Sequence, residues 1–449
     1  MVTSQAELPR RCDVVVVGGG IAGLIAAWHL RDRDIVMLES SERLGGRIRS
    51  ERRGKYWLNF GAHVFAGPGS ASRRLIDEVG VDIRPVQGRL AAVSLNGKLV
   101  SGGPIELVPF RLPLRLGDRL ALVRAGVRLR LAVRRYAAVA RGRPGESAAE
   151  RQQRMLEFMD DRSFTQFMGR LPPDVDALFR CTLTRSSGEP EKLAAGYGIG
   201  YFHLVWNRGE GLSTNIVGGS STLTERIAAA LGERALTNAR VDRVTPVDGG
   251  VVVASEAGEF RARSAIVAAP AYVTCAIVDG LPEETAKALA AIPYGPYVLG
   301  GFLTNETGPS PWDDIYALAT PKRSFGILFN TGNALRIDGR REPGGSMTVA
   351  AAADAARSLA SLSDDEVAER YGAELVDLFP ALDGAIVETK IVRWERGLPH
   401  PTVGRAKLQP ALTRDLSPVF LAGDYLGSWY TETAAQTAEA AAARARAIL

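Results

Sequence analysis

Three glycines and one acid near the start of the chain have the types and the spacing of a nucleotide-binding site. Gly18, Gly20 and Gly23 fit the pattern GxGxxG, and Glu39 follows at the distance expected for an acid that binds a ribose hydroxyl. In this pattern the first glycine allows a tight turn, the second lets the backbone approach a pyrophosphate, and the third lets a helix pack close to a strand. The chemistry predicted is therefore binding of a dinucleotide.

The elements around these residues agree with that prediction. The run of valines at 14–17 is apolar on both sides, which predicts a buried parallel strand, and residues 35–38 predict a second strand that ends at Glu39 and Ser40. A helix is expected from Ile21 and Ala22, so its free N–H groups and positive dipole end would face an anion. A glycine-rich turn without any ligand is the alternative, and the agreement of strand, loop, helix and acid favours the dinucleotide.

A second glycine pair identifies the cofactor. Residues 44–47 read Leu-Gly-Gly-Arg, directly after the predicted ribose-binding acid, and Gly46 and Arg47 suit a second approach to the pyrophosphate. With these residues the chain resembles the flavin-containing amine oxidase superfamily, which includes monoamine and polyamine oxidases, protoporphyrinogen oxidase and phytoene-type desaturases. The resemblance implies FAD rather than NAD. No cysteine lies in the last third of the chain, so we expect the FAD to be non-covalent.

The resemblance continues in blocks and assigns further cofactor contacts. The segment 57–65 resembles the family segment that passes under the flavin, and 238–244 resembles the strand whose valine contacts the adenine through its backbone. The segment 419–449 resembles the final family motif, in which a Gly-Asp pair lies at the ribityl and pyrophosphate and a helix, expected here to begin at a capping box at 433, faces the flavin. The residues implied by these blocks are Gly61, Ala62, Val241, Gly423, Asp424, Thr433 and Ala434.

Candidate catalytic residues follow by position in the same motifs. Tyr430 matches the aromatic residue that walls the flavin in amine oxidases, Trp429 adjoins it, and Trp394 lies in a segment that reads closer to protoporphyrinogen oxidase. Large aromatic residues are also the commonest core residues, so packing is the alternative for each of them. His63 is a candidate of the same kind, for which a core or supporting role is the alternative.

One position departs from the amine-oxidising members of the superfamily. These carry a lysine that holds a water at flavin N5, and here Leu299 stands at that place. The departure puts ordinary amine oxidation, and fast reoxidation by oxygen, in doubt. No second GxGxxG with a strand and an acid is present, so we expect oxygen, a quinone or another diffusible electron acceptor rather than NADPH.

The expected fold is α/β, with a Rossmann-like FAD-binding domain and an inserted α+β substrate domain. The FAD-binding domain is predicted to be discontinuous, made of 1–85, 210–285 and 385–449, and the substrate domain to comprise 86–209 and 286–384. The three cysteines are far apart and have no metal-ligand spacing, so we expect no metal and a reducing, cytoplasmic location.

Charge points to one unusual segment. The net charge of +5 is too small to indicate nucleic acid as a partner, but residues 111–143 hold ten arginines and one acid. On a helix, Leu116, Leu120, Val123, Val127 and Leu131 form one stripe flanked by arginines. Such a helix can lie on an anionic membrane surface, yet a stripe that packs on the core is commoner, and we expect core packing here. No run is long enough to span a membrane.

The sequence thus favours an FAD-dependent oxidoreductase that removes hydride from a mostly apolar or cyclic biosynthetic intermediate, by C–C or C–N desaturation, as in protoporphyrinogen-oxidase-like members. Two alternatives remain. The first is an amine or amino-acid oxidase that yields an imine and hydrogen peroxide, and the second is a non-redox flavin-binding protein or isomerase. The oligomeric state is not predicted.

Overall fold

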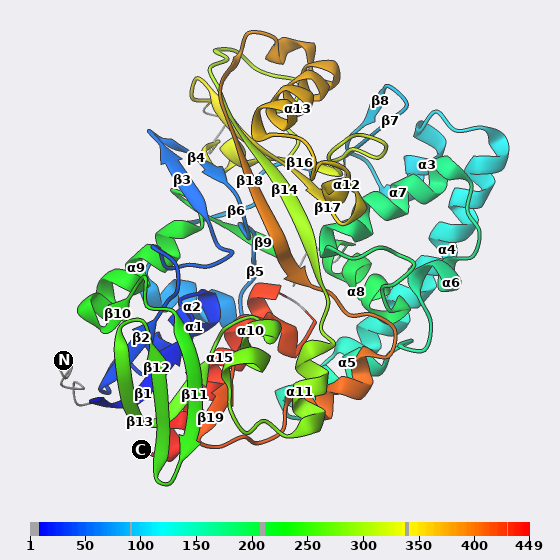
Figure 1. Cartoon of the computed structure of the whole chain (residues 1–449). Coiled ribbons are helices and arrows are strands. Elements are labelled where there is room, and N and C mark those ends of the chain that lie inside the picture. Colours follow the sequence, from blue (N-terminus) through cyan, green and yellow to red (C-terminus); the bar gives the residue numbers. More distant parts are fainter. Residues whose placement is uncertain (1–8, 90–91, 207–211, 337–340, 429) are drawn as a thin grey trace.

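The computed structural model describes residues 9–89, 92–206, 212–336, 341–428 and 430–449. Two large sheets organise the chain, one at the lower left of Figure 1 and one above it, with a group of helices at the right. The first sheet has the order β10-β2-β1-β13-β12-β11, and β19 pairs with the C-terminal end of β13. Its strands are β1 (Arg10–Val17), β2 (Ile35–Leu38), β10 (Ala235–Leu236), β11 (Val241–Val247), β12 (Gly250–Ser255), β13 (Gly258–Val267) and β19 (Val419–Leu421).

The predicted strands at 14–17 and 35–38 are confirmed as parallel neighbours in this sheet. Alternate valines of β1 face opposite sides, as the pleat requires. Val14 and Val16 pack under a layer of helices, and Val15 and Val17 pack in the cluster formed with β11 and β12. The helical layer consists of α1 (Ile21–His29), α2 (Ala71–Val79), α9 (Ser221–Leu231) and α15 (Tyr430–Ala447).

The second sheet is mainly antiparallel and has the order β18-β14-β17-β16-β15-β7-β8. Its long central strand β14 pairs with β17 on one side and with β18 on the other. The predicted boundary at 385 therefore falls just before a strand that belongs to this sheet. The strands are β7 (Ala92–Leu95), β8 (Lys98–Val100), β14 (Tyr294–Thr304), β15 (Ala317–Ala319), β16 (Ile327–Asn330), β17 (Gly345–Ala352) and β18 (Ile386–Pro399).

Shorter elements connect the two sheets and cover them. A two-stranded ribbon and a three-stranded sheet lie between the large sheets in Figure 1, and α13 covers the second sheet through a shared core cluster. The small sheets contain β3 (Ser50–Arg53), β4 (Tyr56–Asn59), β5 (Phe65–Ala66), β6 (Ile83–Pro85) and β9 (Leu212–Ile216). The remaining α-helices outside the right-hand group are α10 (Ala271–Ile277), α11 (Glu283–Ala290), α12 (Asp354–Ser358), α13 (Asp364–Leu378) and α14 (Gln409–Leu412).

The right-hand group of helices contains the arginine-rich segment. It comprises α3 (Val108–Arg111), α4 (Leu116–Ala140), α5 (Ala148–Glu157), α6 (Phe164–Met168), α7 (Pro173–Leu183) and α8 (Ala195–Trp206). A helix was expected within 111–143, and α4 confirms it. Among the described helices, none is long and apolar enough to cross a membrane.

The expectation that the stripe of α4 packs on the core is wrong. The residues of α4 that are buried are Leu122, Ala125, Leu129, Ala132, Val133, Tyr136 and Ala140. The predicted stripe instead lies largely in solvent, and Leu116 is 70% and Val127 56% exposed. Small alanines and one tyrosine complete the buried face, so counting only large aliphatic residues selected the wrong side of the helix.

Candidate active site

A cavity of 2160 Å³ extends from the glycine loop at the first sheet to the helices beside the second sheet. All predicted site residues except Gly23 and Val241 line it. They are Gly18, Gly20, Ile21, Ala22, Glu39, Ser40, Gly46, Arg47, Gly61, Ala62, His63, Trp394, Gly423, Asp424, Tyr430, Thr433 and Ala434. Val241 is buried at the start of β11.

The glycine loop has the shape that a bound pyrophosphate requires. A Cβ atom at Gly23 would lie 1.9 Å from the carbonyl oxygen of Gly18, so this glycine serves the close contact of α1 with the loop. Gly18 has φ +98°, which favours glycine. At Gly20 an added Cβ would meet nothing within 4 Å, because the backbone there borders the cavity. The loop therefore leaves room for a phosphate at the N-terminus of α1.

Glu39 is held beside this loop. One carboxylate oxygen accepts the N–H of Gly19 at 2.6 Å, and the other accepts the N–H and the hydroxyl of Ser41, both at 2.8 Å. The carboxylate is thus fixed at the end of β2, next to the expected phosphate position. This is where an acid can accept hydrogen bonds from a ribose.

Arg47 and Asp424 join the two ends of the chain. The guanidinium makes two parallel hydrogen bonds to the carboxylate, at 2.8 and 2.9 Å, and a third to the carbonyl oxygen of Gly397 at 2.9 Å. Burial alone would lower the pKa of Arg47, but the buried carboxylate of Asp424 offsets this and holds the pKa above its ordinary value. The guanidinium is therefore charged, and its pair with Asp424 fixes Gly423 and Gly46 beside the glycine loop.

The last helix begins earlier than predicted. Helix α15 starts at Tyr430, so Thr433 and Ala434 lie within its first turn instead of forming a capping box at its start. Both still line the cavity. Glu432 accepts hydrogen bonds from the N–H groups of Ala71 and Ser72, at 2.8 and 3.1 Å, which ties α15 to the N-terminus of α2.

Aromatic side chains line the part of the cavity beyond the glycine loop. The hydroxyls of Tyr430 and Tyr197 are 2.5 Å apart, and burial raises the pKa of both phenols, so both stay protonated at neutral pH. Tyr297 on β14 lies opposite Trp394 on β18 in the sheet register. The indole N–H of Trp394 donates to the carbonyl oxygen of Phe60 at 2.7 Å. Trp429 lies outside the described residues.

His63 lines the same cavity as a neutral imidazole. Burial lowers its pKa, and its Nδ1 lies 3.0 Å from the carbonyl oxygen of Gly61. Nδ1 is the donor in that contact, because a carbonyl oxygen only accepts, so Nε2 carries the lone pair. Nε2 is buried and has no hydrogen-bond partner within the described part of the chain. It can therefore accept a hydrogen bond from a ligand.

Leu299 lines the cavity where amine-oxidising members of the superfamily carry lysine. It packs in an apolar cluster with Leu58 and Phe60. Lys322 is the one lysine among the described lining residues, and it forms an ion pair with Asp174. The described structure thus supplies no other lysine in place of the expected one.

Sequence reasoning missed two lining residues in the aromatic region, Tyr201 and Arg185, and the buried Tyr197 that contacts Tyr430. Tyr197 and Tyr201 stand one helical turn apart on α8, a spacing visible in the sequence that indicates one shared face. Arg185 belongs to the short 3₁₀ turn Thr184–Ser186 and lines the cavity beside them. Nothing in the local sequence of Arg185 indicated that it faces a cavity.

Comparison with known proteins shows which family has this arrangement. The family model for the flavin containing amine oxidoreductases matches residues 21–448. A putative flavin-containing monoamine oxidase of Mycobacterium tuberculosis is 28% identical over 280 residues, 58% of each chain. Human protoporphyrinogen oxidase is 39% identical over 111 residues, 21% of this chain and 22% of that one. Each alignment covers less than two thirds of the relative.

Solved structures of putrescine oxidase share the fold. The putrescine-bound wild type superposes with a TM-score of 0.78 over 98% of this chain and 100% of that one, at 17% identity. The α/β fold with a Rossmann-like domain and a substrate domain is thereby confirmed. The chain belongs to the flavin-containing amine oxidoreductase family. This membership makes it an FAD-dependent oxidoreductase and fits the cavity described above.

Proposed function

We propose that the chain oxidises a C–N bond of an amine or amino acid, with FAD bound non-covalently. The observation that carries the proposal is the continuity of one cavity from the glycine loop to Tyr430, Tyr297 and Trp394. The similarity to a putative monoamine oxidase and to putrescine oxidase supports C–N oxidation over the C–C desaturation favoured by the sequence. The similarity to protoporphyrinogen oxidase, which would support C–C desaturation, covers only about a fifth of the chain.

The residues present fit FAD. The open backbone at Gly20 and the N-terminus of α1 would hold the pyrophosphate, Glu39 the ribose, and the first turn of α15 the isoalloxazine. FAD, when bound, supplies the two-electron acceptor of the reaction. Of the described cysteines, Cys181 alone lines the cavity, and burial raises the pKa of its thiol, which disfavours the thiolate needed for a covalent bond.

The protein would orient the substrate and keep it in its oxidisable form. The aromatic wall of Tyr430, Tyr297 and Trp394 excludes water from the reacting carbon. An ammonium group cannot lose hydride, and the lining cations without an ion pair, such as Arg185, would favour binding of the neutral amine. His63 Nε2 would accept a hydrogen bond from the amine N–H.

Leu299 favours a second candidate, a dehydrogenase or desaturase that passes electrons to a quinone. Without the lysine at that position, the support for direct reaction with oxygen is weaker. We therefore propose a quinone or a similar carrier as the acceptor if oxygen proves slow. The reaction with the substrate and the choice of acceptor are separate steps and can be measured separately.

The test is anaerobic mixing of FAD-loaded protein with a panel of amines, amino acids and cyclic C–C desaturation substrates, followed by the visible absorption of the bound flavin. Bleaching by C–N substrates, followed by return of the colour with oxygen or a quinone, would support the proposal. Bleaching only by C–C substrates would support desaturation. No bleaching by any compound would favour the non-redox alternative.

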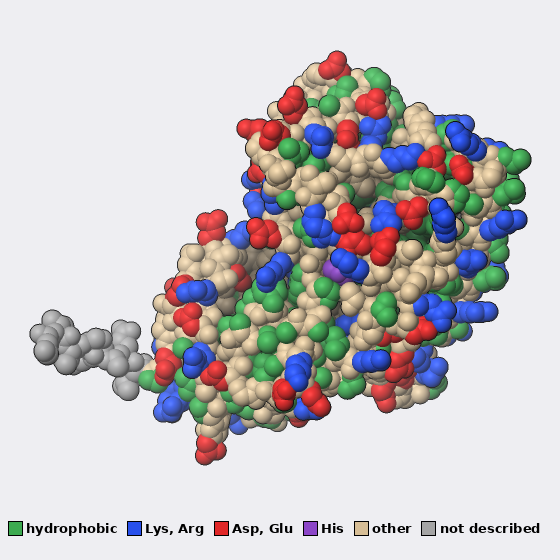
Figure 2. All heavy atoms as spheres, turned by 45° about the vertical axis from the view of Figure 1, so that its right-hand side comes forward, with side chains coloured by type: hydrophobic (Ala, Val, Ile, Leu, Met, Phe, Trp, Pro, Cys, Tyr) green, Lys and Arg blue, Asp and Glu red, His purple; other side chains and the backbone are tan. Residues whose placement is uncertain are grey.

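We also propose that α3 and α4 dock on an anionic membrane. Phe110 on α3 is 62% exposed and Leu131 on α4 is 52% exposed. Arg124 and Arg134 are also exposed on α4. Along the right-hand edge of Figure 2, hydrophobic side chains lie among Lys and Arg side chains. An amphipathic helix of this kind buries its apolar face between lipid headgroups and pairs its cations with anionic lipids.

Co-sedimentation with vesicles tests the docking. We expect the protein to bind vesicles that contain phosphatidylglycerol and not pure phosphatidylcholine. Leu120→Gln with Leu131→Gln should weaken binding, and so should Arg124→Glu with Arg134→Glu. Val387→Gln, at an exposed position of β18, is the matched control. Equal sedimentation of all variants would contradict the proposal.

A further inference from the structure

The substrate end of the cavity contains an arginine that the fold leaves without a counter-ion. The Nε atom of Arg185 is buried and has no hydrogen-bond partner. Among the described residues, no carboxylate lies within ion-pair distance of its guanidinium. The residue is held in place through its backbone, because its carbonyl oxygen accepts a hydrogen bond from the hydroxyl of Tyr297.

The surroundings of Arg185 place it on the aromatic side of the cavity. It lines the cavity together with Tyr201 and Tyr297, and Tyr297 faces Trp394 across the β14–β18 pair. Burial raises the pKa of Tyr201, and the charge of Arg185 lowers it in part, so the guanidinium lies close to that phenol. Arg185 is thus near the reacting region and not near the expected pyrophosphate.

The charges that line the cavity favour an anionic ligand over a cationic one. Ten Lys and Arg residues line it, against four Asp and Glu residues. Six of the ten cations are ion-paired with carboxylates, and Arg185 is among the four that have no ion pair in the described structure. Each of the four acids already has a partner: Glu39 holds the glycine loop, Asp424 pairs with Arg47, and Glu432 holds α2. The fourth, Asp354, pairs with Arg357. A cationic diamine would find no free carboxylate here.

We infer that Arg185 binds a carboxylate of the substrate, so that the natural substrate is an amino acid or another organic acid instead of a simple amine. A guanidinium binds a carboxylate through two parallel hydrogen bonds, and this geometry would orient the substrate against Tyr430 and Trp394. The buried, unpartnered Nε supplies one of the two donors. This inference rests on the proposed function, since it concerns the substrate of the same site.

The test uses FAD-loaded protein and matched pairs of aromatic acids and their amides: benzoate with benzamide, phenylacetate with phenylacetamide, and 3-phenylpropionate with its amide. Binding is read from the change in visible absorption of the bound flavin. We expect at least one acid to bind at least tenfold more tightly than its amide. Arg185→Gln should remove this preference, and Arg185→Lys should restore part of it.

Arg180→Gln is the matched control, because Arg180 lines the same cavity but is already paired with Asp176 and Glu191. It should leave the affinity for the acid within twofold of the wild type. The inference is overturned if every acid binds no better than its amide, or if Arg185→Gln keeps the preference. Protein that fails to retain FAD at all would instead contradict the proposed function, so the two failures are distinguishable.

Discussion

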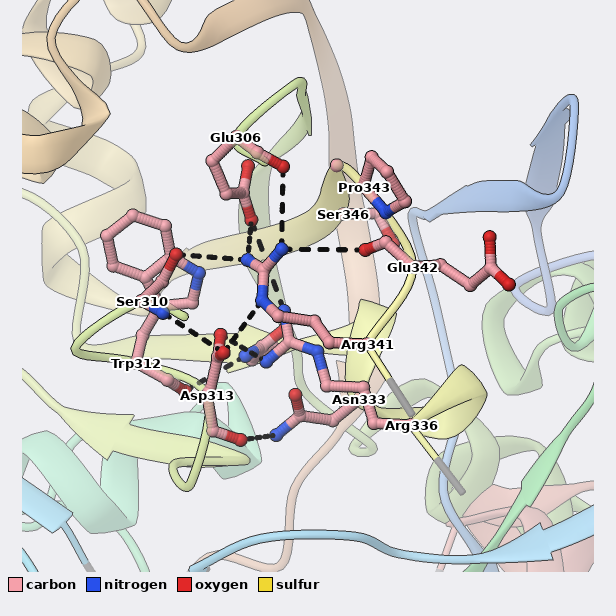
Figure 3. A network of polar contacts seen from close by, with 12 residues as sticks. Glu306, Ser310, Trp312, Asp313, Asn333, Arg336, Arg341, Glu342, Pro343 and Ser346 are labelled. Carbon is pink, nitrogen blue, oxygen red and sulfur yellow. Dashed lines mark hydrogen bonds and ion pairs between the residues drawn. The ribbon is translucent and has the colours of Figure 1, made fainter. Parts of the chain in front are cut away.

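A pair of arginines, Arg336 and Arg341, and the single Arg185 differ in how their charge is balanced. Arg336 and Arg341 converge on Glu306 and Asp313, and Figure 3 shows these side chains pointing toward one another in one network. Arg185, by contrast, lines the cavity with no carboxylate partner in the described structure. The pair has ion-pair partners within the chain, whereas Arg185 has none among the described residues and is open toward a ligand.

The difference teaches which buried charges serve stability and which serve binding. A buried cation is costly unless it is paired, and the network around Asp313 meets that cost internally. At Arg185 the cost of burying the charge remains until an anion binds. Pairing of Arg185 should therefore add little to the stability of the free protein and more to the affinity for an anionic ligand. Substitutions in the pair's network and at Arg185 should therefore separate stability from affinity.

The largest effect is expected in the closed network. Asp313→Ala removes a carboxylate that pairs with both Arg336 and Arg341, which leaves two largely buried cations with Glu306 as their one remaining carboxylate in the described structure. We expect the free energy of unfolding to fall by about 3–4 kcal/mol, measured by urea denaturation. Arg185→Gln should change it by less than about 1 kcal/mol, because no pair is broken. Equal losses for both variants would contradict the distinction.

A buried histidine sharpens the comparison through pH. Burial, with help from Lys192 and Arg357, lowers the pKa of His400 from 6.5 to about 4. The unfolded chain then binds more protons between those values, so stability is full above pH 6.5 and falls as pH drops toward 4. The loss should reach about 3 kcal/mol.

Urea denaturation of wild type and His400→Gln between pH 4 and 7 measures this contribution. The variant should have a flatter profile than the wild type, since glutamine does not titrate. An unchanged slope in the variant would show that other groups cause the loss. The result bears on the comparison because His400, like Arg185, has no carboxylate partner in the described structure, yet it escapes the cost by staying neutral.

The arrangement of the glycine loop was largely predictable because its signals are local. The strand at 14–17, the glycine spacing and the acid at 39 are close in sequence, and each has a steric reason that does not depend on distant residues. The first residue of α15 was misplaced because Thr433 and Gln436 fit a capping box that the structure does not use. The capping-box pattern considers only the residues of one helical turn. It does not include the long-range contact of Glu432 with α2.

The substrate half was less predictable because it depends on long-range packing. The exposed stripe of α4 has the helical period of a core face, and only contacts with distant helices such as α8 select the alanine side. Arg185 likewise becomes a cavity residue only when β14 places Tyr297 against it. Neither result follows from the spacing of residues within one segment.

The ion pair of Arg47 at the proposed cofactor site provides the next test. Arg47→Met removes both hydrogen bonds to Asp424 and leaves that carboxylate buried near the expected pyrophosphate. We expect FAD affinity to fall by tenfold to a hundredfold, measured by fluorescence titration of FAD-free protein. Arg53→Met, which removes a pair with Glu388 away from the cavity lining, should stay within twofold. Full retention of FAD by the Arg47 variant would remove that residue from the site.

The smallest effect concerns two neutral groups that satisfy each other. Tyr430 and Tyr197 share a hydrogen bond between hydroxyls, so Tyr430→Phe keeps the aromatic wall and removes this hydrogen bond. A neutral hydrogen bond contributes about 1 kcal/mol, a factor of about five, and we expect turnover to fall by no more than this while FAD content is unchanged. Tyr430→Ala should lose much more, because the wall itself is removed. A hundredfold loss in Tyr430→Phe would instead show that the hydroxyl takes part in the chemistry, and the wall would no longer be a sufficient account of this residue.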